Sequence, residues 1–179
     1  ISQIKRCSEI LKKISRKQIE DDQFISTVKI EDLLDEIINS FKETSSKEIT
    51  LISEKDENKI DIQRTPEIIY GLRNFIGNAV KFSKSKVKIY LKSDEKNISV
   101  IVTDDGPGFP DDVIDILGEP YIKSKSKEVN ENSGLGLGTF LGKTLLEKKG
   151  ANLVFLKGNK LGGATVVIGW ETKNLKLIV

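Results

Sequence analysis

Hydrophobic and polar positions alternate most informatively in the stretch RTPEIIYGLRNFIGNAVKFSKS, residues 64–85. Thr65 suits a helix N-cap and Pro66 the first helical position, so the pattern predicts a helix from Pro66 to Ser83. Too many positions are apolar for a simple surface helix, which indicates that most of this helix is buried. The apolar positions are Ile68, Ile69, Leu72, Phe75, Ile76, Ala79, Val80 and Phe82.

A polar line runs along this otherwise apolar helix, formed by Asn74, Asn78 and Lys81. Their spacing places the three side chains within roughly 60° of one another around the helix axis. Polar groups on a buried face need partners, because leaving them unpaired is costly. Two interpretations follow: the side chains pair with backbone or water, or they serve a bound anion and its metal ion.

The chain before this helix shows three kinds of pattern. Residues 1–17 place Ile4, Cys7, Leu11 and Ile14 at a/d spacing, which predicts an amphipathic helix. Residues 18–24 form a polar, acidic break that we interpret as a linker. The remainder is predicted as a strand over residues 24–30, a helix over Ile30–Glu43, and a hairpin of two strands, Glu48–Ser53 and Lys59–Gln63.

After the helix, short alternating segments predict strands at Val87–Leu91 and Ile98–Thr103. A short helix over Asp111–Leu117, a lysine-rich loop over Gly118–Ser133 and a helix ending near Lys149 follow, with Gly150 as its terminator. Asn152–Lys157 and Ala164–Trp170 predict a final hairpin. We therefore expect an α+β fold: a two-layer sandwich with a mixed sheet of about five strands, helices on one face, and an N-terminal helix.

Composition excludes several function classes. The chain of 179 residues has a net charge of only +2, so nucleic-acid binding has no electrostatic support. The absence of histidine excludes histidine-based triads, histidine metal ligands and any phospho-accepting histidine within the chain. Cys7 is the single cysteine, which excludes an internal disulfide and fits a reducing compartment.

The chain also lacks an apolar run of about 18 residues, so we expect these residues to be cytoplasmic and not to contact a membrane. It starts at Ile1 within a helical pattern, and this suggests a fragment of a longer protein.

Two further segments carry candidate chemistry. Asp104-Asp105-Gly106-Pro107-Gly108 follows a predicted strand, and a carboxylate at such a strand end is placed to accept from an NH2 group of a ligand. An ordinary turn is the alternative, since Asp, Gly and Pro are common in turns. Gly134-Leu135-Gly136-Leu137-Gly138 leads into a helix N-terminus, where free N–H groups and the helix dipole favour phosphate.

In this order, the three segments resemble a known family. NFIGNAVKFS resembles the N-box, DDGPGF the D-box and GLGLG the G-box of the GHKL ATPase/kinase superfamily, with the spacing of sensor histidine kinases. The resemblance covers roughly residues 25–171 and implies a Bergerat-type ATP-binding fold. The segments RCSEIL, GEPY and GLGLGTFLGKTLLEKKGA further resemble the redox-responsive RegB/PrrB-type sensor kinases.

The resemblance implies ATP and Mg²⁺ as ligands. Asn78 would be the Mg²⁺ ligand, and an amide oxygen suits a hard cation. Asn74 and Lys81 would face the phosphates as the candidate catalytic residues, while Asp104 would accept from the adenine amino group. The remaining residues implied to contact the nucleotide are Phe82, Gly106, Gly108, Tyr121, Lys123, Lys125, Gly134, Leu135, Gly136, Leu137 and Gly138.

Two positions depart from the family pattern, and both concern the loop expected to cover ATP. Asn132 stands where many members have the first glycine of the G-box. Gly118 stands in place of the first phenylalanine of the F-box, with Tyr121 as the loop's aromatic residue. Neither departure removes an implied contact to magnesium or to the base.

Asn74 distinguishes between branches of the superfamily. In chaperone and mismatch-repair ATPases, a glutamate at this position activates water, and an amide cannot act as that base. We therefore predict phosphoryl transfer to a histidine on a separate dimerisation domain, of which residues 1–17 would be the C-terminal part and residues 25–179 the catalytic domain. The alternative is a regulatory module, either a related serine kinase that inhibits a sigma factor or an ATP-gated domain without transfer.

The resemblance also implies partners. They are the protein's own phosphoacceptor domain, a response regulator, and a second copy of the full-length chain. Cys7 lies on the predicted seam of the N-terminal helix, where a cysteine is either a small hydrophobic residue or a redox-active group. The RegB/PrrB resemblance implies the second role, in which oxidation of Cys7 crosslinks or reorders the dimer and lowers kinase output.

Overall fold

The computed structural model describes residues 27–53, 60–120, 137–158 and 160–175. The predicted helix of residues 1–17 and the predicted linker of residues 18–24 lie outside these described residues. Within them, no helix is both long enough and apolar enough to cross a membrane.

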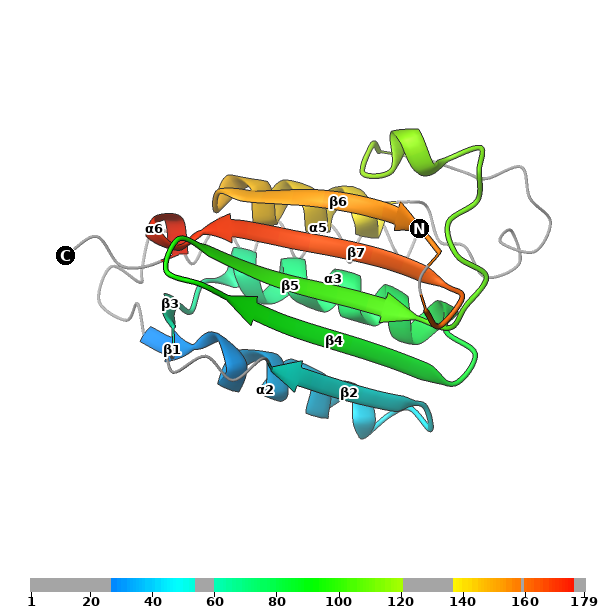
Figure 1. Ribbon diagram of the computed structural model, residues 1–179, viewed down its shortest axis with the longest axis horizontal. Helices are drawn as coiled ribbons and strands as arrows, with labels where there is room; N and C mark the ends of the chain where they lie inside the picture. Colours follow the sequence, from blue (N-terminus) through cyan, green and yellow to red (C-terminus); the bar gives the residue numbers. More distant parts are fainter. Residues whose placement is uncertain (1–26, 54–59, 121–136, 159, 176–179) are drawn as a thin grey trace, which may run out of the picture.

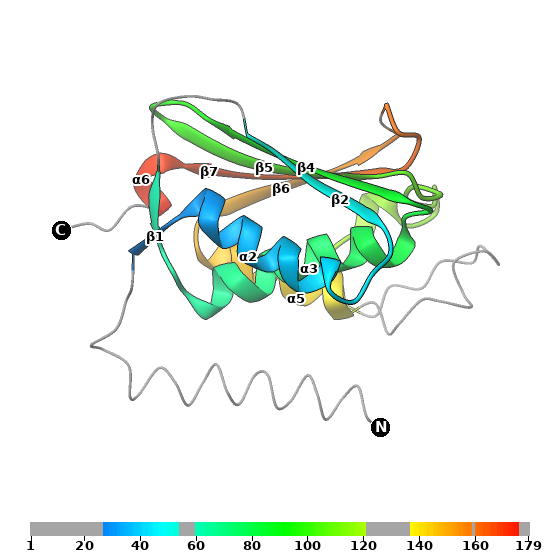
Figure 2. The ribbon, with the colours of Figure 1, turned by 90° about the horizontal axis from the view of Figure 1, so that it is seen from below.

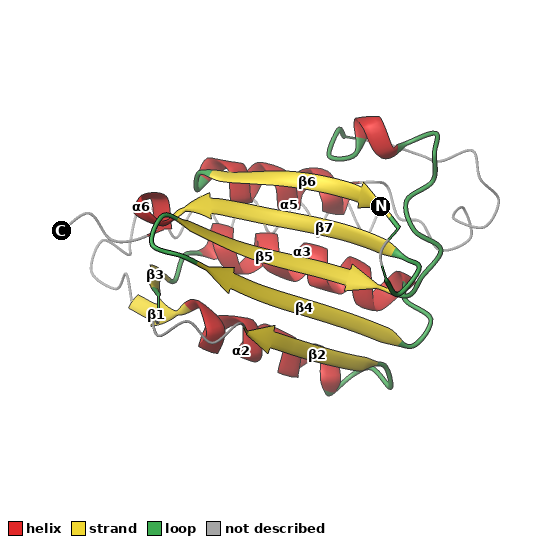
Figure 3. Ribbon diagram, viewed as in Figure 1, coloured by secondary structure: helices red, strands yellow, loops and turns green. Residues whose placement is uncertain are grey.

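A five-stranded mixed sheet forms one layer of the molecule (Figures 1 and 3). Its strand order is β2-β4-β5-β7-β6, with β2 parallel to β4 and every other pair antiparallel. The strands are β2 (Glu48–Ser53), β4 (Lys86–Ser93), β5 (Asn97–Asp104), β6 (Ala151–Lys157) and β7 (Ala164–Glu171). The predicted mixed sheet and the predicted final hairpin, now β6 and β7, are both confirmed.

Three helices cover one face of this sheet: α2 (Ile30–Lys42), α3 (Pro66–Phe82) and α5 (Leu137–Lys148) (Figure 2). The side chains between the layers come from every second strand position and from one side of each helix, as the periods of strand and helix require. The largest fully buried ones include Leu34, Ile38, Leu72, Ile76, Ile89, Ile98, Leu146 and Ile168. The predicted two-layer α/β sandwich is confirmed.

The predicted hairpin of Glu48–Ser53 with Lys59–Gln63 is wrong. The first segment, β2, pairs in parallel with β4, and the second, β3 (Asp61–Gln63), pairs antiparallel with β1 (Thr27–Lys29). Alternation identifies a strand but does not identify its partner. β2 pairs with β4 over six residues, and every second residue of β4 is buried along most of its length. β3 is only three residues long and would give a much shorter pairing.

Three smaller elements also differ from expectation. Of the predicted strand 24–30, residues 24–26 lie outside the described residues, Thr27–Lys29 form β1, and Ile30 already begins α2. The predicted helix Asp111–Leu117 is reduced to the 3₁₀ turn η1 (Ile114–Ile116), with Ile116 N–H donating to the carbonyl of Val113. A short C-terminal helix, α6 (Thr172–Leu175), was not predicted, since four residues carry no periodicity.

Helices α3 and α5 approach each other closely because glycines lie at their contact. A Cβ on Gly71 would overlap the side chain of Leu146, and a Cβ on Gly142 would lie 3.0 Å from Asn74 Cβ and from Phe75 Cε2. At the other end of the contact, the buried carboxylate of Glu67 pairs with Lys148 at 3.3 Å. The approach brings the N-terminus of α5 beside the polar line of α3.

Substituting Gly71 with alanine should destabilise the fold by about 1–2 kcal/mol. Overpacking a core costs about 1–3 kcal/mol and outweighs the gain of up to about 1 kcal/mol from replacing a helical glycine. Leu146 is fully buried within the core, so moving it aside would disturb the side chains packed around it. Urea denaturation measures the free energy of unfolding.

Gly77→Ala is the matched control on the same helix. Its new Cβ would lie 3.1 Å from Cζ of Phe41, the end of a half-buried ring that has room to shift. We expect this variant to stay within about 0.5 kcal/mol of the wild type. A Gly71→Ala protein as stable as Gly77→Ala would contradict the close approach of the two helices.

Candidate functional site

Helix α3 carries the polar line into the structure as predicted. Thr65 caps the helix, its hydroxyl accepting from the N–H of Ile68 at 3.5 Å, and Pro66 takes the first position. The apolar side chains of α3 face the sheet and α2, while Asn74 and Asn78 are half-buried on the side toward α5. Lys81 is exposed in the last turn. The line therefore runs from the helix–helix contact out to the end of α3.

The first turn of α5 lies against this line. Asn78 Nδ2 donates to the hydroxyl of Thr139 at 3.4 Å, and Asn74 Oδ1 lies 3.5 Å from the Cβ position of Gly138. Asn74 also donates through Nδ2 to the carbonyl of Tyr70 at 2.7 Å, which turns its amide oxygen toward α5. The last glycine of the predicted phosphate loop is thus beside the two asparagines.

Asp104 ends strand β5 and is the most enclosed acid of the candidate site. Asp104 is only 5% exposed, and its Oδ1 accepts from the N–H groups of Gly106 at 2.8 Å and Ala164 at 3.2 Å. Burial raises the pKa of Asp104, and the two N–H groups only partly offset the rise. The carboxylate is therefore held by the backbone of two segments that are far apart in the sequence.

Glycines make room for this carboxylate. A Cβ on Gly106 would overlap the carbonyl oxygen of Phe82, so the loop after β5 rests directly on the C-terminus of α3. A Cβ on Gly163 would overlap both the carbonyl and the carboxylate of Asp104. Gly108 has a positive φ of 79°, a conformation that favours glycine. Side chains at Gly106 and Gly163 would therefore not fit around Asp104.

The neighbouring acid, Asp105, has a different task. Its carboxylate accepts from the N–H groups of Lys84 at 2.8 Å and Lys86 at 3.0 Å, and from both the N–H and the hydroxyl of Ser85. Burial by itself would raise the pKa of Asp105, but these hydrogen bonds outweigh it and lower that pKa far below its usual range. Asp105 holds the turn between α3 and β4, which leaves Asp104 as the base-reading candidate.

The structure places nine of the predicted site residues and brings them to one region. These are Asn74, Asn78, Lys81, Phe82, Asp104, Gly106, Gly108, Leu137 and Gly138. The other predicted positions lie outside the described residues: Cys7, Tyr121, Lys123, Lys125, Gly134, Leu135 and Gly136. The Lys81 ammonium lies 5.0 Å from the ring centroid of Phe82, a cation–π contact between two of the predicted residues.

Two residues at the site were missed by the sequence analysis. Thr139 follows the last glycine of GLGLG directly, so its hydroxyl in the first helical turn was a usable signal. Gly163 belongs to the predicted final hairpin turn, and no local pattern distinguished it from a turn glycine. Gly163 directly precedes β7 and contacts Asp104 at the end of the neighbouring strand β5.

The residues present fit a magnesium nucleotide. The Nδ2 donor of Asn78 is used by Thr139, and no described residue donates to its amide oxygen, which is a hard ligand suited to Mg²⁺. No cluster of three acidic or cysteine side chains among the described residues offers a cage for a metal. Mg²⁺ on a nucleotide needs no such cage, since phosphates and water complete its coordination.

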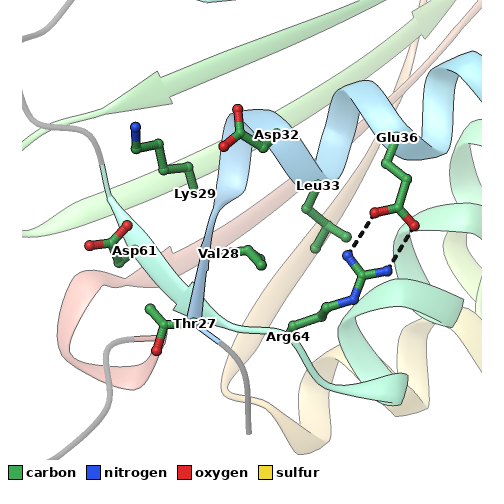
Figure 4. A pocket seen from close by; sticks show the side chains of 8 residues that line it. All are labelled: Thr27, Val28, Lys29, Asp32, Leu33, Glu36, Asp61 and Arg64. Atoms are coloured by element: carbon green, nitrogen blue, oxygen red, sulfur yellow. Dashed lines mark hydrogen bonds and ion pairs between the residues drawn. The ribbon is translucent and has the colours of Figure 1, made fainter. Parts of the chain in front are cut away.

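A separate hollow of about 340 Å³ lies between α2, β1 and β3 (Figure 4). Within it, Arg64 forms a bidentate pair with Glu36 at 2.7 and 2.8 Å. The lining residues are Thr27, Val28, Lys29, Asp32, Leu33, Glu36, Asp61 and Arg64. None of these residues belongs to the candidate site. Two of the charged residues that line the hollow, Arg64 and Glu36, already pair with each other.

Comparison with protein families agrees with this arrangement. The chain belongs to the histidine kinase-, DNA gyrase B-, and HSP90-like ATPase family, whose model matches residues 63–173 and hence more than half of the chain. The matched span begins just before α3 and ends within α6, so it includes every described part of the candidate site. As an ATPase domain, the chain binds ATP.

Within this family, the chain is similar to sensor histidine kinases. It is 41% identical over 105 residues to the sensor histidine kinase RegB of Cereibacter sphaeroides, covering 56% of this chain and 23% of RegB. It therefore spans less than a quarter of the length of that relative.

Solved structures of histidine kinases share the fold. The mycobacterial sensor histidine kinase MprB superposes with a TM-score of 0.66 at 17% identity, over 83% of this chain and 97% of that chain. Full-length ShkA in complex with AMPPNP gives a TM-score of 0.66 at 23% identity, over 81% of this chain and 30% of that chain. The Bergerat-type fold expected from the sequence is thereby confirmed.

Substituting Asp105 with asparagine should lower the free energy of unfolding by about 1–2 kcal/mol at pH 7, because charge-assisted hydrogen bonds are lost at a partly solvent-screened site. The pKa of Asp105 is lower in the folded than in the unfolded protein, so its stabilisation is complete above the unfolded pKa of about 3.9. It is lost progressively as the pH falls below that value. Urea denaturation of both proteins between pH 7 and about pH 2.5 measures the difference.

Asp35→Asn is the control, since Asp35 is exposed on α2. We expect it to match the wild type throughout this range. A stability difference for Asp105→Asn that stayed constant, or grew, as the pH fell would contradict the role given to the Asp105 carboxylate.

Proposed function

We propose that the chain is the ATP-binding catalytic domain of a two-component sensor histidine kinase, which transfers the γ-phosphoryl group of Mg-ATP to a histidine outside this chain. The observation that carries the proposal is the meeting of two asparagines on α3 with the N-terminus of α5. There Asn78 contacts Thr139, and Asn74 lies beside Gly138. The 41% identity with RegB over 105 residues supports the same assignment.

Each side chain has a distinct proposed task. Asn78 holds Mg²⁺ through its amide oxygen, and Lys81, exposed in the last turn of α3, faces the phosphates. The N-terminal turn of α5 contributes N–H groups and the positive end of its dipole to the phosphates. Asp104 accepts from the adenine amino group, and this hydrogen bond is strongest when the carboxylate is ionised. Bound Mg²⁺ supplies neutralisation of the charge that develops on the transferring phosphoryl group.

Asn74 favours transfer over hydrolysis. Its amide has no proton-accepting group of useful basicity, and Nδ2 is already committed to the carbonyl of Tyr70. A water molecule at this position would lack a base, whereas an incoming imidazole is itself a nucleophile and needs only to be positioned. The domain is thus suited to hold ATP until an acceptor arrives.

Finer features of the full-length protein belong to the same proposal. The acceptor is a histidine of the dimerisation domain, the product is passed to a response regulator, and the full-length chain is a homodimer anchored in the inner membrane. Redox-responsive signalling follows from the RegB-type resemblance alone. Its candidate residue, Cys7, lies outside the described residues.

Substituting Asn78 with alanine should weaken Mg-ATP binding at least about tenfold, because a metal ligand is lost. Isothermal titration calorimetry measures the affinity, with Asn39→Ala on the exposed face of α2 as the matched control. The difference between the wild type and Asn78→Ala should vanish when EDTA removes the magnesium. Equal binding of Mg-ATP by both proteins would exclude Asn78 as the metal ligand.

Incubation of this chain with γ-labelled Mg-ATP should leave the protein unlabelled, because it contains no histidine. The full-length protein should become labelled, with the acid-labile, alkali-stable linkage of phosphohistidine. The same full-length protein with the acceptor histidine replaced by glutamine is the control and should stay unlabelled. An acid-stable label on the isolated chain would instead favour the regulatory serine kinase class.

A further inference from the structure

Lys47 makes an unusual contact with the C-terminus of α3. It stands directly before β2, and its ammonium donates to the carbonyls of Val80 at 2.5 Å, Ser83 at 2.6 Å and Lys81 at 3.3 Å. Carbonyls at the end of a helix lack intrahelical partners and form the negative end of the helix dipole. An ammonium has three donors, and here they meet three such acceptors.

The same turn is held from its other side by Asp105. That carboxylate accepts from the N–H groups of Lys84, Ser85 and Lys86, as described above. A cation therefore fixes the carbonyls of the last turn of α3, and an anion fixes the amides that follow. Both charged groups come from distant parts of the chain, 33 residues before Val80 in the case of Lys47 and 21 residues after Lys84 in the case of Asp105.

This turn connects the two halves of the nucleotide site. On one side, Lys81 lies within the turn and Asn78 lies in the turn before it. On the other side, the carbonyl of Phe82 rests against Gly106, whose N–H holds the Asp104 carboxylate at 2.8 Å. Any movement of the last turn of α3 changes the distance between the phosphate-facing side chains and the base-reading carboxylate.

We propose that Lys47 is a positioning residue of the nucleotide site, which fixes the last turn of α3 so that Asn78 and Lys81 lie at the correct distance from Asp104. This inference rests on the proposed function. Lys47 does not itself contact the nucleotide. It acts through the backbone of residues 80–83, and its loss reduces the affinity for the phosphates of ATP more than the affinity for adenosine.

Lys47→Met tests the proposal, since methionine keeps an unbranched stem but has no donor. We expect Mg-ATP affinity, measured by calorimetry well below the thermal transition, to fall by about tenfold, the size of effect that hydrogen bonds to a charged group support. Adenosine affinity, measured by NMR titration, should change by less than about twofold. Lys47→Arg, which keeps the charge and the donors, should recover most of the Mg-ATP affinity.

Lys84→Met is the matched control, because it removes one positive charge from the same turn, where Lys84 is exposed. It should bind Mg-ATP as the wild type does. A double-mutant cycle with Lys81→Met adds a second readout: if Lys47 acts by positioning Lys81, the Lys47→Met substitution should cost less than about threefold in the Lys81→Met background.

The outcomes separate the two proposals. If the wild type fails to bind Mg-ATP, the proposed function fails. If the wild type binds and Lys47→Met binds equally well, the positioning role is wrong. Equal losses for Mg-ATP and adenosine would also overturn it and would show that Lys47 contributes only to general stability. The full loss of affinity in the Lys81→Met background would overturn the positioning of Lys81.

Discussion

The turn between α3 and β4 joins the two parts of the candidate site, the polar line of α3 and the loop after β5. Opposite charges hold it: Lys47 binds its carbonyls and Asp105 binds its amides. The loop that carries Gly106 and follows Asp104 then rests on this turn, without an intervening side chain. Two adjacent acids thereby acquire different chemistry from their surroundings alone. Burial raises the pKa of Asp104, whereas a set of N–H donors overcomes burial and lowers the pKa of Asp105.

The second determinant is the close contact of α3 with α5. Gly71 and Gly142 remove the side chains that would separate the helices, and Glu67 with Lys148 joins them at the far end. The same contact that completes the core also brings Gly138 and Thr139 beside Asn74 and Asn78. The packing of α3 against α5 therefore also sets the geometry of the candidate site, and substitutions at these glycines would change both.

Local pattern predicted most of the fold and much of the site. The helix at Pro66 carried its own start signals, and the strands β4 and β5 were evident from alternation, so these were identified correctly. The partner of β2 was not, because alternation states which face of a strand is buried but not which strand lies beside it. Gly163 and Lys47 were missed for a related reason. Each acts on a group more than 30 residues away, and no short motif records such a contact.

The hydrogen bond from Ala164 to Asp104 joins residues 60 positions apart, at the beginning of β7 and the end of β5. During synthesis, α3, the end of β5 and α5 leave the ribosome before β7 does. The carboxylate of Asp104 gains its full set of partners only when that strand is added to the sheet. Asp104 therefore reaches its native geometry only after β7 has been synthesised, and a ligand that binds through Asp104 would stabilise only chains whose sheet is complete.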